Sequence, residues 1–370
     1  MKKIFKLIAI AFSLLACSCS SKGNQQVKCA SFVGEIDVLG DAILDVVPED
    51  FENCGFKVGD SIDIKFASSG AYIKDIPYYD DFYGSRWATM IVKNNDGLKV
   101  GGQYYNFAET YNIQNNEKVT IYLNKEGKYL DQLEIYRLPI SYDRKDYESD
   151  EVYANFREIT LGKIAPKTLY RSATPCNPKY KRGDYVCNFI DNNGISTVLN
   201  LADTETKFKS YENKNEIIEN LYDDGGIIFA GTDVNFYSEN FRGKLVSALK
   251  LTLEKDGPML VHCSLGRDRT GFVMALLELF AGAKYQDVRK DYMLSFQNIN
   301  FLNPSDSEKY DTYAKELDNV FCYLNDVEDP KVLQIIDFTS KIFEYFRDGG
   351  MSEEECSKLY LKLTGNELAK

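Results

Sequence analysis

The chain's single histidine opens a ten-residue run that constrains the fold more than any other segment: His262-Cys263-Ser264-Leu265-Gly266-Arg267-Asp268-Arg269-Thr270-Gly271. The apolar stretch at residues 259–261 before it has the length of a short buried strand. After the run, apolar residues recur at helical spacing, at Val273, Leu276, Leu277 and Phe280. The run is therefore predicted to be a loop that joins a strand to the N-terminus of a helix.

A loop in this position is suited to hold a phosphate group. The first N–H groups of a helix have no intrahelical acceptor, and the helix dipole places partial positive charge beside them. Arg269 lies six positions after Cys263 and can add a bidentate fork to two phosphate oxygens. The same positive field favours the thiolate of Cys263, which is the nucleophilic form of cysteine. The sequence thus predicts a phosphate-binding loop that carries a nucleophile.

Residues 262–271 resemble the active-site signature of the cysteine-dependent protein tyrosine phosphatases. Residues 266–271 resemble, more narrowly, the Gly-Lys-Asp-Arg-Thr-Gly form of the bacterial tyrosine and phosphoinositide phosphatase branch, with Arg267 in place of the lysine. Because arginine keeps the charge but changes the hydrogen-bonding shape, this departure bears on the preference among phosphorylated substrates. Further stretches agree with the branch, and the match covers roughly residues 150–370: Asn155-Phe156-Arg157, Leu169-Tyr170-Arg171-Ser172, and Gly194-Ile195 through Asn200-Leu201-Ala202-Asp203.

The second half of the chain reads as an α/β domain over residues 155–370. Continuous apolar runs at residues 196–201, 226–230 and 259–261 are typical of buried parallel strands. A helix is predicted before the loop strand from the spacing of Phe241, Leu245, Ala248, Leu249 and Thr252. We expect a mainly parallel sheet flanked by helices, with the loop at the C-terminal end of a strand. The resemblance implies the same cysteine-phosphatase-like fold.

The resemblance implies hydrolysis of a phosphate monoester through a phosphocysteine intermediate on Cys263. Thr270 is expected to donate its hydroxyl to the departing sulfur, or to cap the helix. His262 is expected to lie under the loop and orient its backbone. Neither a metal nor another cofactor is required. The expected phosphate-binding residues form one continuous stretch: Ser264, Leu265, Gly266, Arg267, Asp268 and Arg269.

Two aspartates are candidates for the general acid that protonates the leaving group. Asp268 lies inside the loop, and its counterpart in the resembled branch is the favoured acid; its two flanking arginines favour the ionised carboxyl, however. Asp233 lies 30 residues before Cys263, close to where dual-specificity phosphatases place an acid on a mobile loop. Asp203 is expected to orient a loop, and Arg171 either pairs with such a carboxylate or lies on the surface.

The first half of the chain reads as a separate β domain over residues 31–140. Short β-rich runs alternate with turns, as at residues 61–66, 88–92 and 118–123, which predicts a small, mostly antiparallel barrel or sandwich. The segment is similar to the C-terminal β-domain of S-adenosylmethionine hydroxide adenosyltransferases, but the adenosine-handling partner domain of that family is absent. A structural role, or docking of a partner, is therefore expected. Residues 141–154 are charged and lack apolar periodicity, and we expect them to form a linker.

The N-terminus has the pattern of an exported lipoprotein. Three lysines precede a short apolar stretch, which predicts a signal peptide over residues 1–16. Leu14-Leu15-Ala16-Cys17 resembles a bacterial lipobox, which implies that Cys17 is acylated and that residues 17–30 form a tether. The alternative is a signal peptide that is cleaved without lipidation. We therefore expect an extracytoplasmic protein anchored by lipid to a bacterial membrane.

Charge excludes one class of partner. Loss of residues 1–16, which carry three lysines and no acidic residue, takes the net charge from −12 to −15. Nucleic acid is an improbable ligand for such a surface. The favoured function is a protein tyrosine phosphatase, with dual-specificity or phosphoinositide activity left open. The alternatives are an inositol-polyphosphate phosphatase, suggested by export and the doubly basic loop, and a phosphate-binding or adhesion lipoprotein without turnover.

Overall fold

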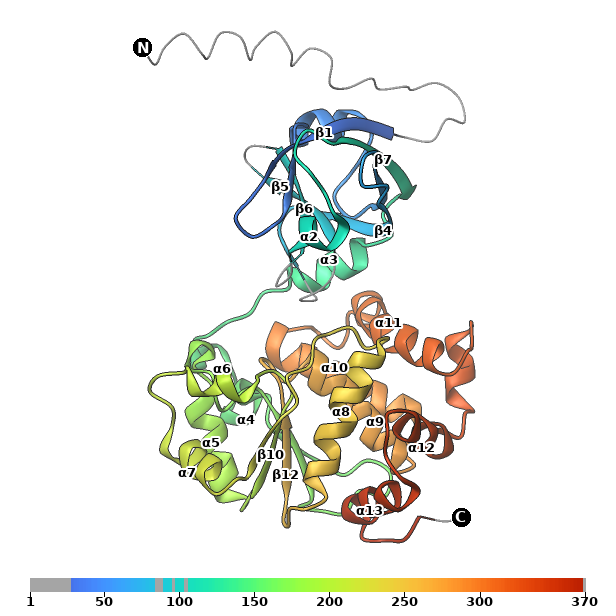
Figure 1. The fold of residues 1–370 in the computed structure, drawn as a ribbon. Coiled ribbons are helices and arrows are strands. Elements are labelled where there is room, and N and C mark those ends of the chain that lie inside the picture. Colours follow the sequence, from blue (N-terminus) through green and yellow to red (C-terminus); the bar gives the residue numbers. More distant parts are fainter. Residues whose placement is uncertain (1–27, 84–88, 95–96, 103–105, 369–370) are drawn as a thin grey trace. The chain divides into compact units, whose positions relative to one another are not determined.

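The computed structural model describes residues 28–83, 89–94, 97–102 and 106–368, which form two compact units that divide between Arg137 and Leu138 (Figure 1). The predicted signal peptide and Cys17 lie outside the described residues. Among the helices that are described, none is long and apolar enough to cross a membrane.

The first unit is a closed barrel of strands in the order β1-β2-β6-β5-β4-β3-β7. Its described pairings are antiparallel except that of β4 with β5, as the sequence predicts. Branched residues on alternate positions, such as Val119 and Ile121, fill the interior. The strands are β1 (Lys28–Ile36), β2 (Ala42–Leu44), β3 (Ser61–Phe66), β4 (Tyr72–Tyr79), β5 (Met90–Asn94), β6 (Gly97–Gly101) and β7 (Lys118–Lys125), and the helices are α1 (Pro48–Asn53), α2 (Phe107–Tyr111) and α3 (Leu130–Tyr136).

The second unit is built on a five-stranded sheet in the order β11-β10-β12-β9-β8. Neighbours from β11 to β9 pair in parallel and β8 is antiparallel, which confirms the expected mainly parallel sheet. Every residue of the three central strands is buried, because helices cover both faces of the sheet. The strands are β8 (Arg157–Ile159), β9 (Leu169–Ser172), β10 (Thr197–Asn200), β11 (Ile227–Phe229) and β12 (Met259–His262).

Helices lie on both sides of this sheet. Figure 1 shows α5 and α7 on one side of β10 and β12, and α8 and α9 on the other. The predicted helix before the loop strand is α8, which Ser238 caps by accepting from the N–H of Phe241. The helices are α4 (Asp150–Ala154), α5 (Gly183–Asn192), α6 (Glu205–Lys209), α7 (Glu216–Asp223), α8 (Glu239–Thr252), α9 (Asp268–Phe280), α10 (Tyr285–Asn300), α11 (Ser307–Leu324), α12 (Phe338–Asp348) and α13 (Glu353–Thr364), with 3-10 turns η3 (Arg144–Asp146), η4 (Pro178–Tyr180) and η5 (Pro330–Gln334).

The structure differs from the linker expected over residues 141–154. This segment forms η3 and α4, and it packs into the second unit through the buried rings of Tyr147 and Tyr153. Both rings contact the guanidinium of Arg182, at 5.1 and 4.5 Å from their centroids. The charged residues of the segment lie on the outside, which gives it the composition of a linker. Tyr147 and Tyr153 nevertheless anchor it to the second unit.

Candidate active site

The loop between β12 and α9 turns sharply at Gly266. This residue has φ +69°, and a Cβ atom there would lie 2.2 Å from the carbonyl oxygen of Ser172. Only glycine fits this left-handed conformation and this close approach. The turn brings the loop back over the end of β9, so that residues 263–267 form a compact bend at the C-terminal edge of the sheet.

The carbonyl groups of the loop point to donors in the surrounding structure. Asn155 Nδ2 donates to the carbonyl oxygens of Leu265 and Gly266, each at 3.1 Å, and Arg171 Nη2 donates to that of Gly266 at 2.8 Å. The N–H of Thr174 donates to the carbonyl oxygen of Ser264 at 3.2 Å. In the part of the chain that the structure describes, the N–H groups of residues 264–267 have no acceptor. The loop therefore presents a set of free amide donors, as an anion site requires.

Cys263 and Arg269 lie at this set of amides. Cys263 is a free thiol and is 3% exposed, so its sulfur lies beneath the surface. Arg269 donates from Nη1 to the carbonyl oxygen of Thr232 at 3.0 Å and from Nη2 to Ser264 Oγ at 3.2 Å. These bonds hold the guanidinium against the loop, in keeping with its predicted role as a phosphate fork.

Thr270 stands in the first turn of α9, and its hydroxyl oxygen is buried. Among the described residues this oxygen has no hydrogen-bond partner. A buried hydroxyl without a partner is costly and rare in folded proteins. It leaves Thr270 available as a donor to the sulfur, one of the two roles expected from the sequence. The other, a helix cap, is not seen: Arg267 is the N-cap residue of α9, and no side chain caps that position.

His262 lies under the loop, fully buried. Its Nδ1 is 3.1 Å from the carbonyl oxygen of Cys263, and its Nε2 is 3.8 Å from Cys176 Sγ. Burial lowers the pKa of the ring to about 4, so the imidazole is neutral at physiological pH. This geometry favours the predicted orienting role over proton transfer.

Arg171 is buried on β9 and pairs with Asp291 rather than with Asp203. It donates to Asp291 Oδ2 at 2.5 Å, while Arg157 donates to Asp291 Oδ1 at 2.6 Å. Burial opposes ionisation of Asp291, but the charges of the two arginines outweigh it and lower the pKa of this carboxyl to about 2. Both arginines also donate to Ser295 Oγ, at 2.9 and 3.1 Å. The side chain that holds the Gly266 carbonyl is therefore itself held by a charged partner.

Asp203 has other partners. Its carboxylate accepts from Tyr211 OH at 2.7 Å and from Asn200 Nδ2 at 3.1 Å. These contacts fix the segment that follows β10. Among the described residues, Asp203 makes no hydrogen bond to the cysteine loop.

The two candidate acids differ in exposure. The Asp268 side chain is 32% exposed at the first residue of α9, and one of its oxygens accepts from Arg267 Nε at 2.9 Å. Asp233 is 6% exposed, and both of its oxygens are engaged, by the N–H of Asn235 at 2.8 Å and by Asn240 Nδ2 at 3.4 Å. Asp268 is therefore the more exposed of the two, and among the described residues its second oxygen accepts no hydrogen bond, whereas Asp233 stabilises its own loop.

Several supporting residues were not predicted as site residues from the sequence. Asn155 ends α4 in the left-handed conformation, which asparagine tolerates better than most residues, and this aims its amide at the loop. Asp291 and Ser295 lie four positions apart on α10 and so share one helix face. That spacing and the Asn155-Phe156-Arg157 stretch were the sequence features that could have indicated these supporting residues.

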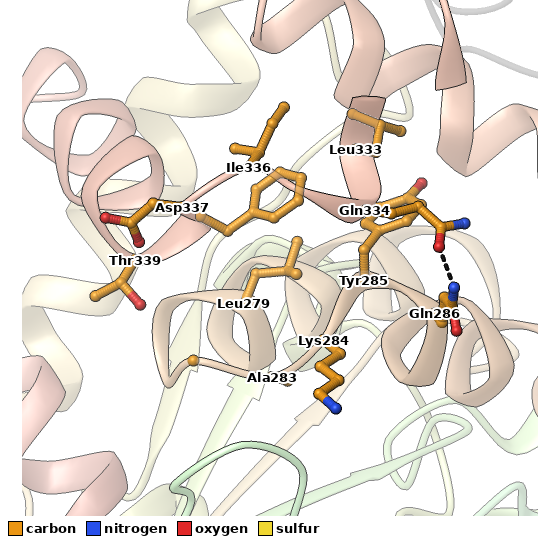
Figure 2. Close-up of a pocket in the computed structure, with 12 residues that line it drawn as sticks. Leu279, Ala283, Lys284, Tyr285, Gln286, Leu333, Gln334, Ile336, Asp337 and Thr339 are labelled. Atoms are coloured by element: carbon orange, nitrogen blue, oxygen red, sulfur yellow. Dashed lines mark hydrogen bonds between the residues drawn. The ribbon is translucent and has the colours of Figure 1, made fainter. Parts of the chain in front are cut away.

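A cavity of about 500 Å³ lies elsewhere in the second unit, where the end of α9 and the start of α10 meet the segment that leads into α12 (Figure 2). Apolar side chains such as Leu279, Leu333 and Ile336 line it, and Gln286 and Gln334 hydrogen-bond at its side. None of the candidate site residues contributes to its lining. The cavity is therefore separate from the cysteine loop.

Residues 151–365 match the model of the tyrosine phosphatase family, which covers more than half of the chain. The chain belongs to the tyrosine phosphatase family. This confirms the resemblance that the loop and its flanking stretches indicate.

The individual proteins that resemble this tyrosine phosphatase family member share low sequence identity with it. Over 129 residues it is 27% identical to a Yarrowia lipolytica protein named as the tyrosine-protein phosphatase OCA1, covering 34% of this chain and 46% of that one. The chain thus spans about half the length of that curated relative. Among solved structures, TpbA of P. aeruginosa is similar at 17% identity over 48% of this chain and 97% of TpbA, with a TM-score of 0.27. An uncharacterized conserved protein from Thermotoga maritima is similar at 12% identity over 27% of this chain and 40% of that one, with a TM-score of 0.23.

We predict that Gly266→Ala destroys the anion site. Alanine in the left-handed region costs about 1–2 kcal/mol by itself, and here its Cβ would also collide with the Ser172 carbonyl, 2.2 Å away. Titration with inorganic phosphate should show no binding, and thermal unfolding should shift downward. Gly194→Ala is the matched control, because Gly194 has φ +60° and nothing within 4 Å of the added Cβ. Phosphate binding by Gly266→Ala that equals that of Gly194→Ala would contradict this account of the loop.

We also predict that His262 makes the second unit less stable in mild acid. The unfolded ring takes a proton near pH 6.5 and the folded ring only near pH 4, so its contribution is complete above pH 6.5 and is lost as the pH falls toward 4. From pH 7.5 to 5 the loss amounts to as much as about 2 kcal/mol. His262→Asn keeps a donor near the Cys263 carbonyl without titrating, and should remove this part of the pH dependence. Hydrogen exchange of β12 amides measures it, and equal pH dependence in both proteins would refute it.

Proposed function

We propose that the second unit hydrolyses phosphate monoesters, and phosphotyrosine in proteins in particular, through a phosphocysteine intermediate on Cys263. The observation that carries the proposal is the buried Cys263 at a loop whose amides have no acceptor among the described residues and against which Arg269 is held. Membership of the tyrosine phosphatase family supports the choice of phosphotyrosine.

In the first step the Cys263 thiolate attacks phosphorus in line. The P–S bond forms as the ester P–O bond breaks, and Asp268 donates its proton to the leaving oxygen. The loop amides and Arg269 bind the three equatorial oxygens, where negative charge concentrates in the transition state. Because the carbonyls of this loop are already hydrogen-bonded on its outer side, the donors need little reorganisation during the reaction.

In the second step water attacks the phosphocysteine. The P–O bond forms as the P–S bond breaks, Asp268 takes the proton from water, and the thiolate departs. The Thr270 hydroxyl, which has no partner among the described residues, can donate to the sulfur as its negative charge returns. Inorganic phosphate then leaves the loop, and the starting protonation states of Cys263 and Asp268 are restored.

A non-catalytic role in phosphate binding is the competing function. Cys263→Ser separates the two, because a hydroxyl is a far weaker nucleophile while the amide donors remain. We expect turnover of an aryl phosphate to fall below about 1% of wild type, with the dissociation constant for inorganic phosphate unchanged within about twofold. Wild-type protein that binds phosphate but shows no turnover of any aryl phosphate would establish the binding role instead.

The assignment of the acid predicts a dependence on the leaving group. Asp268→Asn should slow an ester with a poor leaving group by about 10²-fold or more, and one with a good leaving group far less, because the latter needs no proton. Asp233→Asn should show no such difference between the two esters, since its carboxylate is engaged within its own loop. Steady-state kcat for both esters measures this, and the reverse pattern would make Asp233 the acid.

A further inference from the structure

The side chain of Arg267 is committed to protein contacts on three sides. Its Nε donates to Asp268 Oδ1 at 2.9 Å and its Nη1 donates to Asn300 Oδ1 at 2.7 Å. Its guanidinium carbon lies 4.8 Å from the ring centroid of Phe296. The residue is only 6% exposed, so this cation of the loop lies within the protein, between α9 and α10.

We propose that Arg267 is a positioning residue that holds the general acid Asp268, and that its side chain is not a phosphate ligand. This inference rests on the proposed function. Asn300 is then a second positioning residue, because its Oδ1 accepts a hydrogen bond from Nη1 of the same guanidinium.

Asn300 is a fixed anchor for this arrangement. It is the last residue of α10 and is buried, and its Nδ2 donates to the carbonyl oxygen of Pro139 at 3.1 Å. With its amide nitrogen used in this way, its oxygen faces Arg267. A planar guanidinium bonded at two nitrogens and stacked on Phe296 has little freedom to turn, so it defines where Asp268 Oδ1 lies.

This restraint assigns different tasks to the two oxygens of Asp268. Oδ1 is held by Arg267, which leaves Oδ2 to carry the proton toward the leaving group. The benefit of this contact is positional: with Oδ1 fixed by Arg267, Oδ2 stays in one place for the proton transfer.

The same restraint bears on the class of substrate. With Arg267 bonded to Asp268 and Asn300, the loop offers one guanidinium, that of Arg269, to a ligand. This matches an ester with one phosphate group, such as phosphotyrosine, better than an inositol ring with several adjacent phosphates. The doubly basic loop therefore does not favour an inositol polyphosphate as substrate.

Kinetics of Arg267→Gln test the proposal on the full chain. We expect kcat to fall by about tenfold or more on an ester with a poor leaving group and by less than about threefold on one with a good leaving group. The dissociation constant of inorganic phosphate should stay within about twofold of wild type, and Arg267→Gln/Asp268→Asn should be no slower than Asp268→Asn alone. Lys290→Gln on the exposed face of α10 is the matched control for loss of one positive charge. It should leave the ratio between the two esters unchanged.

Other outcomes would overturn the proposal. Weaker phosphate binding by tenfold or more, an equal loss on both esters, or a loss that adds to that of Asp268→Asn would make Arg267 a phosphate ligand. If Arg267→Gln does not fold, Asn300→Ala decides, because it removes the anchor without changing the loop: the poor-leaving-group ester should again be slowed selectively, and an unchanged ratio refutes the inference. Turnover of the good-leaving-group ester by wild type, lost in Cys263→Ser, tests the proposed function separately.

Discussion

The bridge from Asp291 to two arginines is the contact on which the active-site loop depends. Arg157 and Arg171 face each other across the antiparallel pair β8 and β9, an arrangement that repulsion would otherwise disfavour. Asp291 accepts from both and removes that repulsion. Burial raises the pKa of the nearby Glu278 carboxyl well above its usual range, which opposes a second negative charge beside the bridge. Removing one partner of such a buried pair costs about 3–5 kcal/mol.

The two arginines of this bridge connect it to the loop. Arg171 donates directly to the Gly266 carbonyl, and Arg157 donates from Nη1 to Asn155 Oδ1 at 2.9 Å, which leaves Asn155 Nδ2 directed at the same loop. Because peptide groups are planar, carbonyls held on the outer side turn the adjoining amides inward. These charges under the sheet edge thus set the direction of the proposed phosphate donors before any ligand arrives, which is the preorganisation that electrostatic catalysis requires.

The sequence predicted the parts of this site that are local and missed those that depend on distant contacts. The strand, the loop and the following helix come from one continuous run, so the positions of Cys263 and Arg269 followed from it. Asp291 lies 120 residues from Arg171. The spacing of Asp291 and Ser295 indicates a shared helix face, but it does not indicate Arg171 as the partner of that face. Arg171 was expected to pair with a carboxylate such as Asp203 or to lie on the surface, but Tyr211 and Asn200 engage Asp203. Residues 141–154 read as a linker since η3 and α4 are too short to show apolar periodicity.

Arg267 and Arg269 have separate tasks for a geometric reason. They are two positions apart where the chain enters α9, and at about 100° per residue their side chains leave the helix roughly 200° apart. In the structure they have different partners: Arg269 lies against Ser264 and Thr232, and Arg267 faces α10. A lysine at this position, as in the resembled signature, has one charged nitrogen and no planar fork, so it could not hold Asp268 and Asn300 in one plane. In the proposed mechanism the arginine and its asparagine anchor thus act together, and they position the acid and do not bind the phosphate.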